Sequence, residues 1–170
     1  RQMCIRDRDI EISPNTVKKY LEIFESLFLI FRVTTYSKNI ARSLKKEYKV
    51  YFFDTGLVKG DEGVKFENFV AISLKKHLTF LEDTKGLTTE LQYLKTKEKQ
   101  EVDFALIIDD KVDTIIEVKT KKDDIPKPLL YYKDKYDFKS ILLLKETKRQ
   151  RSVNGVEIRI AHKYLAQLQA

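Results

Sequence analysis

The first part of the chain carries apolar residues at helical spacing and then two apolar runs of strand type. The helical pattern spans Ser13 to Phe28, and Ser13 followed by Pro14 is a typical helix start. The apolar positions of this pattern are Val17, Tyr20, Leu21, Phe24, Leu27 and Phe28. The strand-type runs cover 29–35 and 48–53. The pattern therefore predicts one helix followed by two strands.

A turn at 60–63 separates this part from a second set of predicted elements. The pattern predicts a helix at 64–80, strands at 90–94, 102–108 and 112–119, a helix at 128–136, strands at 140–144 and 156–160, and a closing helix from His162. Helix, three strands, helix and strand is one α/β layer arrangement. We therefore expect an α/β (α+β) protein whose second domain, at 61–170, has a mixed central sheet flanked by helices.

The loop between the two N-terminal strands is basic. It carries Lys38, Arg42, Lys45 and Lys46 against a single acid, Glu47. Helix, strand, basic loop and strand is the order found in the last half of a winged helix. This order predicts a truncated winged-helix-like segment at 9–60, with the loop cations facing nucleic acid. The alternative is a helix and hairpin that pack on the next domain and leave a solvated basic loop.

Composition narrows the classes of protein that fit. Lys plus Arg exceed Asp plus Glu by 33 to 26, which is compatible with a nucleic-acid partner. The single cysteine excludes a disulfide framework, and two histidines exclude a structural zinc site. No apolar run approaches the roughly 20 residues that span a bilayer, so we expect a cytoplasmic protein. The first eight residues, RQMCIRDR, resemble a peptide translated from a sequencing adapter, and we exclude this artefact from the fold.

Glu67 stands where the helical pattern calls for an apolar residue. At about 100° per residue it shares a stripe with Val70, Ala71, Leu74 and Leu78. The opposite side of the helix is predicted to carry Lys65, Asn68, Lys75 and Lys76. An unpartnered buried charge costs several kcal/mol, so Glu67 should have a cation, a donor or a functional role. The alternative is a half-exposed glutamate in the first turn, favoured by the helix dipole.

Two further acids, Asp103 and Glu117, lie in the strands joined by a tight turn at 109–111. If three residues stay unpaired there, Ile108 opposes Val112 and Asp103 lies directly across from Glu117 on one face. Like charges at that separation repel, so a cation is expected between them. Period 2 also places Lys119 on the face of Glu117. A register shift of one residue would separate the two acids.

Carboxylates that hold Mg²⁺, with a lysine two residues along the same strand, are suited to phosphodiester hydrolysis. Mg²⁺ takes oxygen ligands and keeps several waters, one of which it can activate as a nucleophile. The lysine then balances charge on the scissile phosphate. Lys121 and Lys122 follow this strand and are placed to contact phosphates, although Asp123 and Asp124 offset their charge.

These residues together resemble a known superfamily. Glu67 on a helix, Glu101-Val102-Asp103-Phe104 entering one strand and Ile116-Glu117-Val118-Lys119 ending the next resemble the PD-(D/E)xK nucleases, especially their archaeal Holliday-junction-resolvase-like branch. Val102 stands where the superfamily has proline. The run from Ser13 through 51–57, 66–68 and 117–119 resembles the C-terminal domain of unknown function of bacterial and archaeal AAA-type P-loop ATPases.

The resemblance implies a function and a role for each site residue. Asp103 and Glu117 would be metal ligands for Mg²⁺ or Mn²⁺, Lys119 the catalytic lysine, and Glu67 an accessory acid that can also bind the metal. The implied activity is metal-dependent cleavage of DNA by an endodeoxyribonuclease domain. The alternative is a non-catalytic DNA- or partner-binding module of the ATPase.

The ATPase part of such a protein is missing from this sequence. The chain contains no Gly-Lys dipeptide, so it has no Walker A loop and no ATP site. We therefore expect a fragment of a longer protein. Its expected partners are DNA and the P-loop ATPase module of the parent, through which it can form oligomers.

Overall fold

The computed structural model describes residues 12–36, 47–96, 98, 100–121, 123–147 and 149–168. Its elements are α1 (Pro14–Ser26), β1 (Ile30–Thr35), β2 (Tyr48–Phe52), the 3-10 turn η2 (Thr55–Leu57), α2 (Glu62–Lys85), β3 (Thr89–Lys95), β4 (Glu101–Ile108), β5 (Lys111–Lys119), α3 (Lys127–Tyr136), β6 (Lys139–Leu144), β7 (Arg151–Val153), β8 (Val156–Ile160) and α4 (Ala161–Leu165). Residues 1–8 and the predicted nucleic-acid contacts Lys38, Arg42, Lys45, Lys46 and Lys122 lie outside the described residues.

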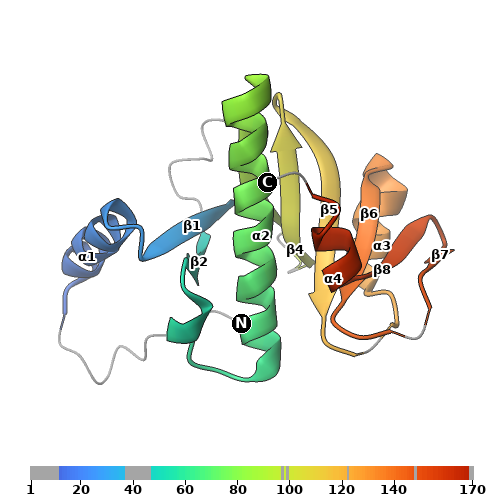
Figure 1. Cartoon of the computed structure of the whole chain (residues 1–170), viewed down its shortest axis with the longest axis horizontal. Coiled ribbons are helices and arrows are strands. Elements are labelled where there is room, and N and C mark those ends of the chain that lie inside the picture. Colours follow the sequence, from blue (N-terminus) through green and yellow to red (C-terminus); the bar gives the residue numbers. More distant parts are fainter. Residues whose placement is uncertain are drawn as a thin grey trace.

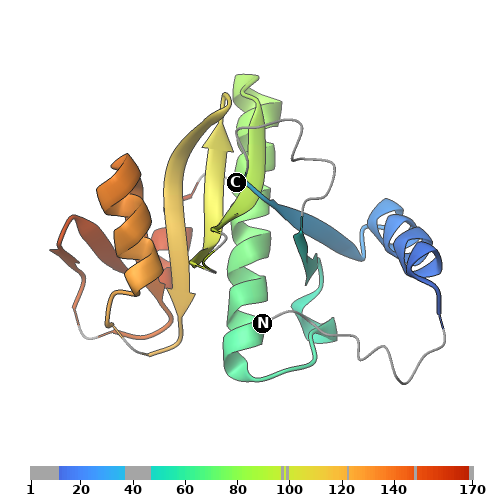
Figure 2. The same cartoon turned by 180° about the vertical axis from the view of Figure 1, so that it is seen from behind.

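The strands form one mixed sheet in the order β2-β1-β3-β4-β5-β6-β8-β7. β1 and β3 are parallel, as are β5, β6 and β8, while the other neighbouring strands are antiparallel. Helix α2 packs on one face together with α4, and α3 covers the other face (Figures 1 and 2). The predicted α/β class with a mixed sheet and flanking helices is confirmed.

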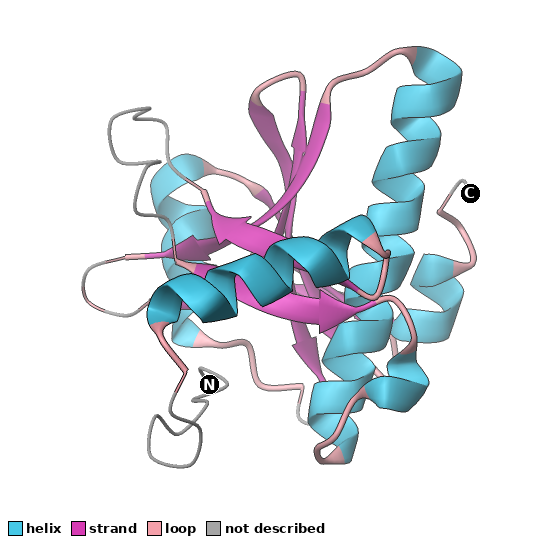
Figure 3. Cartoon of the chain, turned by 90° about the vertical axis from the view of Figure 1, so that its left-hand side faces the viewer, coloured by secondary structure: helices cyan, strands magenta, loops and turns pink. Residues whose placement is uncertain are grey.

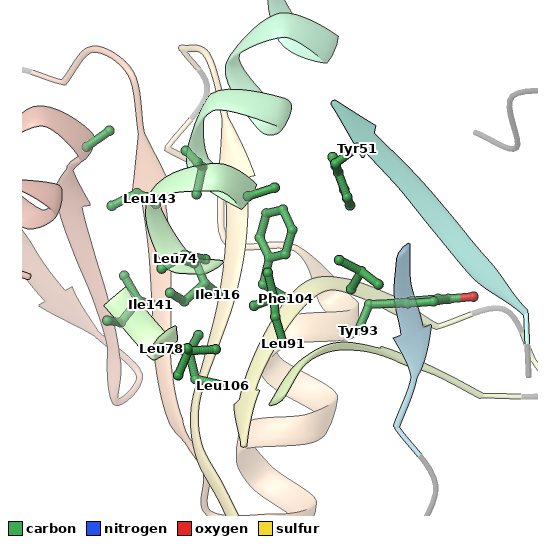
Figure 4. Close-up of a cluster of buried hydrophobic side chains, with 14 of the residues drawn as sticks. Tyr51, Leu74, Leu78, Leu91, Tyr93, Phe104, Leu106, Ile116, Ile141 and Leu143 are labelled. Carbon is green, nitrogen blue, oxygen red and sulfur yellow. The ribbon is translucent and has the colours of Figure 1, made fainter. Parts of the chain in front are cut away.

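Two apolar clusters hold these layers together. The cluster between α2 and the sheet includes Leu74, Phe104 and Ile116. Figure 4 shows Phe104 at its centre, with Leu74 and Ile116 on one side and Tyr51 on the other. The second cluster lies between the sheet and α3 and includes Ala105, Ile115 and Leu129. Because both faces are covered, the central strands are apolar on both sides, and β6 is buried from Ser140 to Leu144.

Helix α2 is longer than its predicted extent of 64–80. It begins after Asp61, whose side chain accepts a hydrogen bond from the Val64 N–H, and it ends at Gly86 in the left-handed conformation. The predicted apolar stripe is buried. Asn68, predicted on the opposite side, is also buried, so that placement was wrong. Its amide accepts from the Phe52 N–H at 2.8 Å and donates to the Phe52 carbonyl at 2.9 Å, which supplies an edge strand with the partner it lacks.

The turn between β4 and β5 is tighter than predicted. Ile108 pairs with Lys111, so only Asp109 and Asp110 stay unpaired, and both have positive φ, as two-residue hairpin turns require. The prediction that Ile108 opposes Val112 was therefore wrong. A bulge at Asp113 adds one residue to β5, after which Phe104 pairs with Ile116. The bulge restores the predicted register toward Asp103 and Glu117.

Helix α1 is confirmed as a helix, but it does not enter either apolar cluster. Ser13 caps it as predicted, and none of its residues is buried. Figure 3 looks from the side on which α1 lies, and the helix is outside the layers formed by the sheet and α2. Arg32 of β1 donates to Glu25 through Nε at 2.8 Å, which fixes the end of α1 to the sheet.

The sheet runs across the domain boundary predicted near residue 60. β1 pairs in parallel with β3, so the hairpin of the first predicted segment extends the sheet of the second. The winged-helix-like segment and the nuclease-like domain stay predictions. Strand β7, which pairs with β8, was not predicted. Among the described residues, no helix is both long enough and apolar enough to cross a membrane.

Candidate functional site

The candidate site lies where β4 and β5 stop pairing. Their ladder ends at Phe104 and Ile116, and Asp103 and Glu117 are the next residues outward. Opposite Tyr93 the β3–β4 ladder shifts by one residue, because Gln92 pairs with Ala105 while Leu94 pairs with Val102. As a result Val102 joins the cluster under α3, although Phe104, two residues on, joins the cluster under α2. Simple alternation therefore fails at Asp103.

Asp103 contacts the backbone of β5 next to Glu117. One carboxylate oxygen of Asp103 accepts a hydrogen bond from the Val118 N–H at 3.0 Å. The backbone of Asp103 also lies close enough to the Glu117 carboxylate to lower its pKa. Ile116 and Val118 pack under α2, as alternation along β5 predicts, so Glu117 and Lys119 leave the strand on the other side. The side chains thus replace the ladder bonds that the separating strands no longer make.

The cation beside Asp103 is a lysine from β2, the edge strand of the sheet. Lys49 Nζ of β2 lies 3.2 Å from Asp103, 3.0 Å from Glu101 and 3.6 Å from Glu67. It also stands over the ring of Tyr93, 5.3 Å from the centroid. Its side chain is only 20% exposed. We call Lys49, Glu67, Glu101 and Asp103 the lysine–acid cluster.

Glu67 has a donor as well as a cation. The hydroxyl of Tyr51 donates to Glu67 at 2.7 Å. The Tyr51 ring packs against Phe104 and Phe31, with centroids 5.6 and 5.7 Å away, which fixes the hydroxyl. The expectation that Glu67 needs a cation or a donor is met by Lys49 and Tyr51.

The charges of the lysine–acid cluster shift the pKa of its members. Burial by itself lowers the pKa of Lys49, but Asp103, Glu67 and Glu101 together raise it above its ordinary value. Burial and the nearby charge of Asp103 raise the pKa of Glu67, against the opposing effect of Lys49 and Tyr51. Burial, followed by the charges of Glu67 and Asp103, raises the pKa of Tyr51. Lys49 therefore stays charged and Tyr51 stays a donor at neutral pH.

Glu117 is less well compensated. Burial and the charge of Asp103 raise its pKa to about 8, while Lys119 lowers it. Within the part of the chain that the structure describes, Glu117 Oε2 is the buried side-chain oxygen or nitrogen that has no hydrogen-bond partner. An unsatisfied buried acceptor costs about 1–3 kcal/mol, so this oxygen needs an explanation.

The four predicted site residues are thus brought near one another through different contacts. Glu67 and Asp103 share Lys49, Asp103 accepts from the Val118 N–H beside Glu117, and Lys119 acts on Glu117 through its charge. Across the described ranges, no set of three or more His, Cys, Asp and Glu side chains is arranged to hold a metal ion. Asp103 directs one oxygen to Lys49 and the other to Val118.

Sequence reasoning missed Lys49, Tyr51 and Glu101 as members of this site. A weak signal was present, because Lys49 and Tyr51 share one face of a strand whose other positions, Tyr48, Val50 and Phe52, lie on the opposite face. A lysine on the same face as a core tyrosine is unusual. Its partners lie far along the chain, and only the order of the strands brings them together.

The predicted nucleic-acid residue Lys121 lies at a surface hollow next to the site. The hollow is also lined by Asp123, Glu146, Thr147, Arg149 and Arg151. It follows the carboxyl ends of β5 and β6, where open α/β sheets bind ligands. Arg151 is paired with Asp123 at 2.7 Å, so part of its basic charge is already neutralised.

The residues present fit a divalent cation at the Asp103–Glu117 pair. A carboxylate oxygen without a partner, beside a second carboxylate, is the type of oxygen ligand that Mg²⁺ takes. Glu67 is engaged by Lys49 and Tyr51, and its part in metal binding stays a prediction.

Two family comparisons cover most of the chain. Residues 62–164 match the family described as "Domain of unknown function (DUF4143)", and residues 5–64 match "Domain of unknown function (DUF8612)". The chain belongs to the DUF4143 family, which is found in C-terminal domains associated with AAA ATPases. The expected relation to such C-terminal domains is confirmed at this level.

A curated relative and the solved structures add little about activity. A Haemophilus influenzae protein described as "Uncharacterized protein" is 28% identical in an alignment of 156 positions that covers 88% of this chain and 36% of that protein. The chain therefore spans about a third of the length of this relative. No solved structure matches the chain.

Proposed function

We propose that this chain is the nuclease-like part of a AAA-type ATPase and that Asp103, Glu117 and Lys119 carry Mg²⁺- or Mn²⁺-dependent hydrolysis of DNA. The observation that carries the proposal is the unpartnered buried oxygen of Glu117 beside Asp103, two residues before Lys119. A site that only stabilised the fold would gain by replacing Glu117 with an apolar residue, since the orphan acceptor destabilises the folded state.

Each residue has a distinct part in the proposed reaction. Asp103 and Glu117 would hold the cation, which supplies an activated water and charge stabilisation when it is bound. Lys119, on the same strand face as Glu117, would lie against the scissile phosphate and balance its developing negative charge. Glu67 would act as the accessory acid, with its carboxylate oriented by Tyr51.

The proposal includes partners and a cellular setting. Lys121 and Arg149 line the hollow beside the site and would contact the phosphate backbone of DNA. The P-loop module of the parent protein would be the second partner, with any oligomer formed through it. The cytoplasm, where DNA and ATP are both present, is the proposed location.

A second function, a non-catalytic module that binds DNA or a protein partner, is favoured by one observation. Lys49 already pairs with Glu67, Glu101 and Asp103, and these ion pairs hold β2, α2 and β4 together without any metal. In that case the charged cluster is a fixed part of the fold, and the ATPase would move this domain together with its partner.

The test uses the full-length parent protein with Mg²⁺ or Mn²⁺ on linear, single-stranded and four-way-junction DNA. We expect cleavage by the parent and its loss in Asp103→Ala and in Lys119→Met. Lys111→Met, which changes an exposed lysine at the far end of the same strand, is the matched control and should cleave normally.

The outcomes separate the two functions. Equal residual cleavage in the parent and in Asp103→Ala would indicate a contaminating nuclease and would contradict the enzyme. DNA binding that falls steeply with salt, without cleavage and unchanged in Asp103→Ala, would favour the binding module.

A further inference from the structure

We propose that Lys49 is an internal competitor of the divalent cation, which holds Asp103 while the site is empty and gives it up when the cation binds. This inference rests on the proposed function, because it takes Asp103 to be a ligand of that cation. It assigns to Lys49 control over metal affinity, a role that the nuclease resemblance does not include.

Both oxygens of Asp103 already have a donor. Oδ1 pairs with Lys49 Nζ at 3.2 Å, and Oδ2 accepts from the Val118 N–H at 3.0 Å. Each oxygen keeps a second lone pair, but a divalent cation bound at Asp103 is repelled by the Lys49 ammonium group and competes with it for Oδ1. The Val118 N–H belongs to the backbone of β5 and cannot move without disturbing the sheet, whereas Lys49 ends a flexible side chain.

Lys49 has other partners after it leaves Asp103. Its Nζ also contacts Glu101 at 3.0 Å and Glu67 at 3.6 Å, so its charge stays paired within the lysine–acid cluster. A small movement of Nζ toward Glu101 frees Oδ1 of Asp103 without leaving a buried ammonium group unpaired.

The two acids of the proposed metal site differ in their partners. Asp103 is held by Lys49, while Glu117 Oε2 has no partner among the described residues. Glu117 can thus bind a cation without losing a partner, whereas Asp103 is already paired with the ammonium group of Lys49. The apo fold remains stable because Lys49 offsets the repulsion among the three acids it contacts.

The test measures Mn²⁺ and Mg²⁺ binding to the intact chain by calorimetry, together with melting temperature, in wild type and Lys49→Met. We expect Lys49→Met to bind Mn²⁺ about tenfold more tightly or more, since the internal competitor is gone. We also expect a lower melting temperature without metal and a larger rise on adding Mn²⁺ than in wild type.

The matched control is Lys95→Met. Lys95 lies on the neighbouring strand β3, contacts Glu101 at 4.0 Å and also pairs with Glu47, but it makes no ion pair with Asp103. Its replacement should leave Mn²⁺ affinity within about twofold of wild type, since Lys95 does not hold either of the proposed metal ligands. If Lys49→Met is too unstable to purify, Lys49→Met/Glu101→Gln removes one unpaired acid and leaves Asp103 and Glu117 intact.

The outcomes distinguish this inference from the proposed function. Mn²⁺ affinity that is unchanged or weaker in Lys49→Met and in the double variant, with binding in wild type, would overturn the competition while leaving the metal site in place. The absence of Mn²⁺ binding in wild type and in every variant would overturn the metal-dependent function, and the competition with it.

Discussion

The lysine–acid cluster and the Glu117 carboxylate lie next to each other, but in the described part of the chain only the cluster contains a cation in contact with its acids. Glu67, Glu101 and Asp103 surround one ammonium group, and Glu67 has a tyrosine donor besides. Glu117 lies beside Asp103, and its Oε2 has no hydrogen-bond partner among the described residues. The first group is completed by the fold itself. The second is only partly satisfied by the described residues.

The comparison shows that the sheet offsets the charge of some of its buried acids and leaves another incompletely satisfied. Lys49 comes from the edge strand β2 and pairs with the acids of α2 and β4, so part of their negative charge is offset locally. The cost of the unsatisfied oxygen is then confined to one residue at the end of the β4–β5 ladder. Functional sites are the places where such local costs are expected.

Replacing Lys49 should have the largest effect on stability. Lys49→Met without metal leaves three buried or half-buried acids without their shared cation, and we expect a loss of about 3–5 kcal/mol in the free energy of unfolding. Urea denaturation of the chain at pH 7.5 measures it, with Lys95→Met as the control. If Lys49→Met loses no more free energy of unfolding than Lys95→Met, Lys49 does not stabilise the acids of the lysine–acid cluster and the contrast with Glu117 fails.

Glu117→Gln should change how stability depends on pH. The folded pKa of about 8 lies above the ordinary value of 4.5, so the protonated carboxyl stabilises the folded state. That stabilisation is fully present below pH 4.5 and is lost as the pH rises through about 8. Denaturation at pH 5 and pH 9 should show a decline in wild type that is smaller in Glu117→Gln by roughly 2–4 kcal/mol. Parallel curves for the two proteins would contradict the raised pKa.

Asp103→Asn should sharpen the comparison by removing the neighbouring charge. Burial is the largest cause of the raised pKa of Glu117, and the charge of Asp103 is the next. We therefore expect the pKa of Glu117 to fall in Asp103→Asn while staying above 4.5, as measured by carbon NMR of the labelled carboxyl group. The control is Asp113→Asn, which changes an acid on β5, the strand of Glu117, but nearer the turn. It should leave the pKa of Glu117 unchanged.

Tyr51→Phe should have the smallest effect. It removes the hydroxyl that donates to Glu67 but keeps the ring against Phe104 and Phe31. We expect a loss of about 1.5–3 kcal/mol, the range for a hydrogen bond to a charged group. Thermal unfolding beside Tyr48→Phe, whose ring is 43% exposed, measures the difference. Equal melting temperatures would show that the Glu67 carboxylate is satisfied without this donor.

The periodicity of apolar residues determined the element types, the α/β class and the mixed sheet. The burial of the helix stripe at Val70, Leu74 and Leu78 also followed from it, because one face of a helix must meet the sheet. The acids Glu67, Asp103 and Glu117 were found for the same reason. Each broke a local pattern that is visible without any knowledge of distant contacts.

What the tertiary structure alone decided depends on pairings between segments far apart in the chain. The placement of Lys49 beside Asp103, the burial of Asn68 against Phe52 and the break in alternation opposite Tyr93 all follow from strand order and bulges. The turn after Ile108 is one residue shorter than predicted, and the bulge at Asp113 restores the predicted register beyond it. Local periodicity carries no information on which strand will lie beside which, because that choice is made by the packing of the whole sheet.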